Sequence, residues 1–348
     1  MLAMMAAAAS ALHHPAAPHP AAPRLPRAHH VRMRWTAPSP AAPLPLPTAT
    51  PAFWSLHEHA QQQALRWAPL GLGAAYAAWP TARHGLDAAV ASVWAGLCAQ
   101  PWAHHCMFEA CTASFGFFAA IVFFSSLHRL MRSPAAAYRL DGQPPSEMFQ
   151  WLTRRHWRKW LPLPVYLLSV RAFHLLRTKP LLPMAPPSFG LFAAELACGI
   201  FLYDLLFYPL HRLLHATRWG KRVHAYHHSW PSGRSLAPLE TVQHSYADGF
   251  LQVAVNIFVQ CTPLFGPKHV LSRLAHNLVV TYLLAEAHSG YDLPWSSHRA
   301  WPALFGGAPR HEHHHASGRG AYQQFFRYLD DADLAVTVRK RKRSPLDT

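Results

Sequence analysis

Histidine spacing is the feature of this 348-residue chain that points most directly to chemistry. Two boxes, HRLLH and HAYHH, follow one another closely, and a third, HEHHH, lies near the C-terminal end. Spacings of three and four residues place side chains on one face of a helix, and neutral imidazole is a ligand for iron, zinc, copper or nickel. With the single histidine of EAHSGYDLPW, the candidate metal ligands are His211, His215, His224, His227, His228, His288, His311, His314 and His315.

The size of this set predicts two metal ions, because one such ion takes about four to six ligands. His313 lies two positions from His311, on the opposite side of a helix, and is left out of the set. His244 and His276 are reserve ligands. A structural role is the better interpretation for these two, since each stands alone.

Composition places the histidines in a membrane protein. The chain is 51% hydrophobic and 14% charged, against about 25% charged in soluble domains. The apolar runs 107–127 and 188–210 are long enough to cross a bilayer, whereas 250–266 and 270–287 fall just short, and 160–176 suits an interfacial or re-entrant piece. The pattern predicts an all-α integral membrane protein with about four transmembrane helices.

The apolar runs within 160–210 form one down-and-back pair, and those within 250–287 form a second. Each pair returns the chain to the side of the membrane that it left, so the boxes are predicted to lie on one side. Basic residues beside the spans mark this side as cytosolic, so we expect a cytosolic-side histidine-rich helical cap. The net charge of +16 suits anionic lipid headgroups. Nucleic acid is not an expected partner of a multi-span chain. The five cysteines show no C-x-x-C spacing and predict no disulfide framework.

The boxes and their flanking sequence resemble the fatty acid hydroxylase/sterol desaturase superfamily of membrane enzymes. The resemblance extends to DLLFYPL before the first box, HSGYDLPW and HHASGRGAYQQFFRYLDDADLAVT, and ETVQHSYADGFLQ is similar to sterol-desaturase-like members. It implies a non-haem di-iron centre that uses O2 as co-substrate, with the nine histidines at the ligand positions. HEHHH departs from the family by one extra histidine.

The domain organisation follows from this resemblance and from composition. Residues 1–60 form an Ala/Pro-rich segment predicted to be disordered, either a transit peptide or a biased tail. Residues 61–134 form an N-terminal membrane-associated region, 135–338 the di-iron domain, and 339–348 a basic tail.

Carboxylates near the boxes are expected to offset the metal charge and to orient imidazoles by accepting their second N–H. Two of them lie inside apolar runs, where an unpaired carboxylate is costly, and for the other three a solvated loop position is an equal alternative. The five are Asp204 and Glu286, then Glu240, Asp292 and Glu312.

The expected reaction is hydroxylation or desaturation of a sterol or fatty-acyl lipid in the membrane, a choice that the boxes leave open. Basic residues around Arg218, Lys221, Arg222, Arg310 and Arg319 are expected to steer an acidic electron donor, such as a b-type cytochrome or a ferredoxin with its reductase. The expected location is the endoplasmic reticulum, with a plastid membrane as the alternative. Two rival readings are a catalytically inactive zinc-binding membrane protein and a b-type haem membrane protein.

Overall fold

The computed structural model describes residues 56–130, 138–141, 162–176, 182, 185–229 and 235–334. In these residues the regular structure is helical, and the β contacts are isolated bridges without a strand. The prediction of an all-α fold is confirmed for this part of the chain. Most of the segment 1–60 and the basic tail lie outside the described residues. All five cysteines are free.

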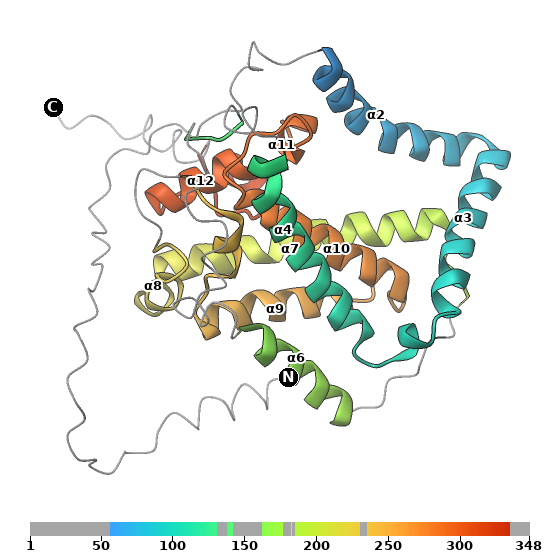
Figure 1. Cartoon of the computed structure of the whole chain (residues 1–348), viewed down its shortest axis with the longest axis horizontal. Helices are drawn as coiled ribbons and strands as arrows, with labels where there is room; N and C mark the ends of the chain where they lie inside the picture. The colour runs from blue at the N-terminus through green and yellow to red at the C-terminus, as the bar shows by residue number, and fades with distance from the viewer. Residues whose placement is uncertain are drawn as a thin grey trace. The chain divides into compact units, whose positions relative to one another are not determined.

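The helices follow one another along the chain, and Figure 1 labels the α-helices among them. They are α2 (Leu56–Ala78), α3 (Pro80–Cys98), η1 (Pro101–His104), α4 (Phe108–Leu130), α6 (Pro162–Leu176), α7 (Phe189–Ala216), α8 (Arg218–His224), η4 (Pro238–Val242), α9 (Tyr246–Cys261), α10 (Val270–Ala287), α11 (Ser297–Ala300) and α12 (Gly307–Ser317).

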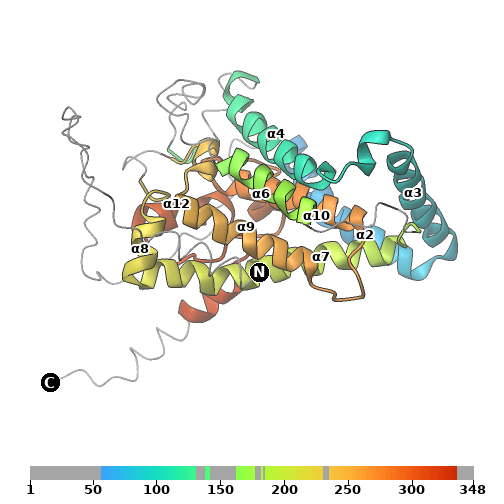
Figure 2. The same ribbon diagram turned by 90° about the horizontal axis from the view of Figure 1, so that it is seen from below.

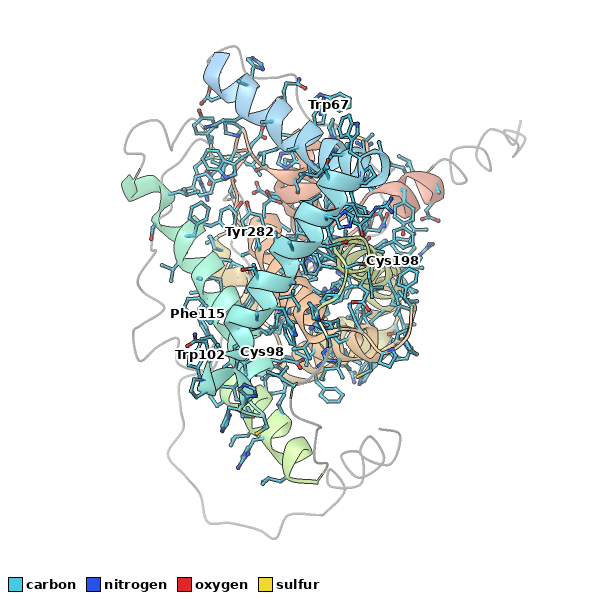
Figure 3. The ribbon with its side chains drawn as sticks, turned by 90° about the vertical axis from the view of Figure 1, so that its right-hand side faces the viewer. Trp67, Cys98, Trp102, Phe115, Cys198 and Tyr282 are labelled. Carbon is cyan, nitrogen blue, oxygen red and sulfur yellow. The ribbon has the colours of Figure 1, made fainter. Side chains whose placement is uncertain are left out.

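Two of these helices are long and apolar enough to cross a membrane, at Phe108–Leu127 in α4 and Phe189–Ala216 in α7. Only 33% and 22% of their apolar windows are buried by protein, whereas the core helix of a soluble protein is mostly buried. Phe115, labelled in Figure 3, is 73% exposed. These faces therefore suit contact with lipid. α9 and α10 are shorter, at 16 and 18 residues, and the four-span topology stays a prediction.

α7, α9 and α10 form the bundle that carries the site. α7 packs against both α9 and α10, and Figure 2 shows α9 running beside α7. Tyr203 and Phe207 of α7, Val259 of α9 and Val280 of α10 share one apolar core with Phe325. Burial of these side chains fixes the spacing between the helices and thereby positions the polar residues at the ends of the bundle.

α4 packs along α10 on a second apolar core, in which Ile121 and Phe124 are fully buried. α2 is tied to the C-terminal part of the chain, because Gln62 Nε2 donates to the Arg299 carbonyl at 3.0 Å. The region 61–134 therefore shares packing with the histidine-bearing part, and the proposed domain boundaries stay predictions.

Short polar side chains begin the helices that carry the site. Ser188, Thr217 and Ser245 precede α7, α8 and α9, and each accepts the backbone N–H three residues further on. These caps satisfy donors that the first helical turn leaves free. Gly318 ends α12 in the left-handed region, with φ of 65°. Local sequence thus sets where each histidine-bearing helix begins or ends.

Candidate metal centre

The nine predicted histidines come together in two adjoining buried clusters. In each cluster, one ring nitrogen of every member lies within 4.8 Å of those of the others. His313 belongs to neither cluster. The first cluster contains His211, His215, His224, His228 and His314, and the second contains His227, His288, His311 and His315.

The sequence boxes are divided between the clusters, which the spacing alone does not predict. His224 and His228, four residues apart, enter the first cluster, whereas His227 enters the second. In the third box the four-residue pair enters the second cluster and His314 enters the first. α8 ends at His224, and the second box continues in the turn that follows it. Each of these two boxes therefore contributes to both clusters.

The Nε2 atoms within each cluster converge on one another. His224 Nε2 lies 3.1 Å from the Nε2 atoms of His211 and His228. In the second cluster, His311 Nε2 lies 2.9 Å from that of His288. Two ligands about 2.1 Å from one ion and at right angles to each other are about 3.0 Å apart. The spacing of the nitrogens therefore fits ligands of a shared ion.

Hydrogen bonds on the other ring nitrogen fix the tautomers of His211 and His224. His211 Nδ1 lies 2.8 Å from the Tyr322 carbonyl, which can only accept, so Nδ1 carries the proton. His224 Nδ1 donates in the same way to Asp248 Oδ2 at 2.8 Å. The lone pairs of the two Nε2 atoms then face one another, with the nitrogens 3.1 Å apart. Two buried lone pairs at this distance repel unless a cation lies between them.

His288 and His314 are oriented in the same way. Their Nδ1 atoms donate to the carbonyls of Leu284 and Gly320, each at 2.8 Å. His314 Nε2 is buried and has no hydrogen-bond partner among the described residues. A buried imidazole nitrogen left in this state is costly, so the donor set fits a metal ligated through Nε2.

The clusters hold their imidazoles in the neutral form that binds metal. Burial, and then the charge that neighbouring histidines would carry, keeps the pKa of five rings well below the ordinary 6.5. Deprotonated nitrogen is the ligand form of histidine. The five are His227, His228, His311, His314 and His315.

Asp248 is a site residue that the sequence analysis missed. It is fully buried and accepts hydrogen bonds from His224 and His244, the second at 3.0 Å. Burial opposes ionisation of this carboxyl, but the charges and hydrogen bonds of His244 and His224 keep its pKa well below the ordinary value. The available signal was an acid four residues after a histidine, in the first turn of an apolar helix.

The two reserve histidines lie outside both clusters. His244 stacks on His227, with ring centroids 4.2 Å apart and an interplanar angle of 16°. His276 Nε2 lies 3.1 Å from Asn256 Oδ1, in the α9–α10 interface. His244 therefore supports the second cluster by packing, and His276 belongs to another part of the bundle.

Asp204 supports the site through a loop and not through an imidazole, which corrects the sequence interpretation. Its carboxylate accepts from Gln323 Nε2 at 2.6 Å and from the Phe325 N–H at 2.7 Å. The same loop carries the Tyr322 carbonyl that orients His211. Gly320 and Ala321 adopt left-handed backbone angles, with φ of 65° and 49°, directly before that carbonyl.

The hydrogen bonds of Glu286, Asp292 and Glu312 likewise go to groups outside the two clusters. These carboxylates hold the segments that flank the histidine-bearing helices, because their partners belong to neighbouring loops or short helices. The fifth predicted carboxylate, that of Glu240, is buried in η4. Glu286 accepts from the Ser297 N–H and hydroxyl, Asp292 from His298 and Arg299, and Glu312 from the Ser235 hydroxyl and the Leu236 N–H.

This geometry defines a helical protein with a buried polyhistidine centre at one end of its bundle. The family model described as fatty acid hydroxylase matches residues 196–332, which contain all nine histidines. This part of the chain is therefore similar to the fatty acid hydroxylase family, and the match covers less than half of the 348 residues. No solved structure matches the chain.

Similar proteins carry names of several lipid-modifying activities. A cholesterol 25-hydroxylase-like protein of Danio rerio is 30% identical over 39% of this chain and 53% of its own length. A putative methylsterol monooxygenase of Dictyostelium discoideum is 30% identical over 47% of this chain and 56% of its own length. A very-long-chain aldehyde decarbonylase of Oryza sativa is 31% identical over 48% of this chain and 61% of its own length. The chain thus spans little more than half the length of these relatives.

Proposed function

We propose that this protein is an O2-dependent lipid oxidoreductase whose two histidine clusters hold a non-haem di-iron centre. The observation that carries the proposal is the convergence of five and four buried imidazoles, several of them with Nε2 lone pairs fixed inward. Two bound irons would supply the oxidising power to take hydrogen from an unactivated C–H bond with O2. The similarity of residues 196–332 to the fatty acid hydroxylase family supports iron as the metal.

The residues of the chain would bind and orient the metals and exclude water from them. Tyr322 and Gly320 carbonyls and the Asp248 carboxylate hold protons on Nδ1, which leaves Nε2 free to ligate. Asp248 also places one negative charge beside an otherwise neutral shell, where it offsets part of the charge of two divalent ions.

The rings are packed too closely for the haem alternative. Nε2 atoms within a cluster approach to 2.9–3.4 Å, and the His228 and His315 rings of the two clusters stack at 4.3 Å. A porphyrin between two axial histidines needs open space that these rings occupy. Zinc fits the same donors but has no redox chemistry, so the identity of the bound metal separates the enzyme from an inactive zinc protein.

The proposed substrate is a membrane lipid, a sterol or a fatty-acyl chain. Two of the three relatives described above are named for sterol oxidation and the third for a long-chain aldehyde. Hydroxylation and desaturation both begin by removing hydrogen, and both stay within the proposal. We propose an endoplasmic reticulum membrane, with the histidine-rich cap on the cytosolic side, and a plastid membrane as the alternative.

The proposed electron donor is a small acidic carrier, a b-type cytochrome or a ferredoxin with its reductase. Arg218 and Arg222 of α8 are exposed close to the second box and offer a docking charge. Arg310 does not contribute to this surface, because it is buried and its guanidinium pairs with Asp331 at 3.0 Å. The basic docking surface therefore lacks Arg310, one of the five residues that the sequence analysis assigned to it.

The test is turnover of purified, reduced protein with sterols and fatty-acyl lipids under ¹⁸O2, followed by mass spectrometry of the lipids. One ¹⁸O atom in the product identifies hydroxylation, and loss of two hydrogens without ¹⁸O identifies desaturation. Heat-denatured protein is the control. Iron-loaded protein that consumes no O2 and changes no lipid in either class would contradict the proposal.

A further inference from the structure

Buried polar atoms without partners gather at the end of the bundle opposite the histidine clusters. Lys268 Nζ, Ser272 Oγ and His276 Nδ1 have no hydrogen-bond partner among the described residues. Lys268 is 8% exposed, and the other two are fully buried. Proteins rarely leave such groups unsatisfied, because each loses its hydrogen bonds to water on burial. Together they indicate a site for a polar ligand.

A glycine brings two of these atoms together. A Cβ atom on Gly199 of α7 would lie 2.6 Å from Lys268 Nζ and 2.7 Å from His276 Nδ1. Only a residue without a side chain allows both groups to lie against α7 at this point. Cys198, the preceding residue, is labelled in Figure 3. On α10, Ser272 and His276 are four residues apart and so share one face of the helix.

A small pocket lies beside Lys268 at this end of the bundle. It is lined by Glu195, Lys268, Val259, Thr262, Leu264 and Phe265. Glu195 is 4% exposed, and its described hydrogen bonds are long ones, at 3.3 and 3.4 Å from the His269 N–H. Lys268, with a buried Nζ donor, and Glu195, with a carboxylate acceptor, therefore line the same pocket, and most of its remaining wall is apolar. We call this site the Lys268 pocket.

The pairing of donor and acceptor selects the chemistry of the ligand. An anionic headgroup would be repelled by Glu195, and a cationic one by Lys268. A hydroxyl group satisfies both, because it accepts from Lys268 and donates to Glu195. We propose that the Lys268 pocket binds the hydroxyl group of a lipid alcohol, which on the proposed function is the substrate of the histidine centre.

The distance between the two sites fits a lipid. Twelve residues separate Gly199 from His211 on α7, and twelve separate His276 from His288 at the end of α10. At 1.5 Å per residue, both helices place the pocket about 18 Å from the clusters. This separation is close to the length of one lipid molecule, because one leaflet takes up half of the roughly 30 Å hydrocarbon core of a bilayer.

Exposed apolar side chains connect the two ends along α9. Tyr246, Phe250, Ile257 and Phe258 are 42–58% exposed, and Phe265 at the pocket is 54% exposed. A lipid with its hydroxyl in the Lys268 pocket would lie along this face with its far end toward the histidines. The proposal therefore assigns oxidation to the end of the lipid remote from its hydroxyl.

The test compares lipids and variants in one equilibrium binding assay on the detergent-purified full chain. The lipid pairs are cholesterol with cholest-5-ene, and 1-octadecanol with octadecane, which differ by one hydroxyl. We expect about tenfold tighter binding of the hydroxylated member in at least one pair, because it gains charge-assisted hydrogen bonds. Lys268→Met and Gly199→Ala should remove this preference. Gly96→Ala is the matched control, since no atom lies within 4 Å of its Cβ.

Two outcomes would overturn the proposal. Equal binding of both members of both pairs to the unmodified protein means that the pocket holds water only. A preference that survives Lys268→Met means that the hydroxyl binds elsewhere. Iron content measured on the same samples distinguishes failure of the pocket proposal from failure of the di-iron proposal. Iron-loaded protein without the preference contradicts the pocket alone, whereas protein that shows the preference but binds no iron contradicts the di-iron function alone.

Discussion

The two ends of the α7–α9–α10 bundle both bury polar side chains, but they satisfy them differently. At one end, nine groups of the same kind converge, and carbonyls or a carboxylate fix several of them with the lone pair inward. At the other end, Lys268 Nζ, Ser272 Oγ and His276 Nδ1 have no hydrogen-bond partner among the described residues, and Lys268 lines a pocket with the carboxylate of Glu195. Identical acceptors that face one another require a cation, whereas mixed donors and acceptors suit a neutral hydroxyl.

Loss of a ligand should have the largest effect of any single change. His314→Ala removes a buried Nε2 from the first cluster, so we expect loss of bound iron and of all turnover, with membrane insertion retained. His227→Ala should do the same at the second cluster. Metal analysis, the ¹⁸O2 assay and membrane fractionation measure the three properties. His313→Ala is the control, and full turnover by the His314 or His227 variant would remove that residue from the metal shell.

Loss of the negative charge of Asp248, whose carboxylate accepts from His224 Nδ1, should have a smaller effect. Asp248→Asn keeps the shape of the side chain but removes its charge, and we expect iron affinity to fall about 10–100-fold. A chelator competition titration measures this affinity. Asp333→Asn, at a position whose side chain is 42% exposed, is the control. Unchanged iron affinity in the Asp248 variant would show that the His224 tautomer does not depend on this hydrogen bond.

At the other end of the bundle, removal of buried charge should stabilise the fold. Burial lowers the pKa of Lys268 to about 8, although the Glu195 carboxylate acts against this shift. Lys268→Met combined with Glu195→Gln removes both buried charges of the pocket, so we expect the lipid-free protein to gain about 1–3 kcal/mol in free energy of unfolding. Thermal unfolding in detergent measures the change. Destabilisation of similar size would mean that Lys268 already has a partner.

An ion pair near the histidine end should give the protein a pH dependence. Burial tends to raise the pKa of Asp292, but hydrogen bonds and charges from His298 and Arg299 lower it from 3.8 to about 2. The pair therefore stabilises the fold above about pH 4, and this contribution of about 2 kcal/mol is lost as the pH falls toward 2. Asp292→Asn should lower the melting temperature at pH 7 and have little effect near pH 2. An equal effect at both values would contradict the assigned pKa.

The sequence predicts what depends on local spacing and misses what depends on tertiary packing. Histidines three and four residues apart mark the ligand set, because helical periodicity is local. The division of the boxes between clusters is set by how α8 and α12 meet α7 and α10. Asp248 was missed because its contact with His224 joins two helices. Asp204 was assigned to an imidazole on nearness in sequence, whereas its carboxylate faces the loop before Phe325.

Elemental mass spectrometry of the detergent-purified protein, with a visible spectrum of the same sample, tests the central claim most directly. We expect two irons per chain and no haem Soret band. Zinc in the purified protein should be replaceable by iron on reconstitution, with turnover appearing at the same time. Folded protein that binds neither metal, before or after reconstitution, would contradict the claim that the two histidine clusters are a metal centre.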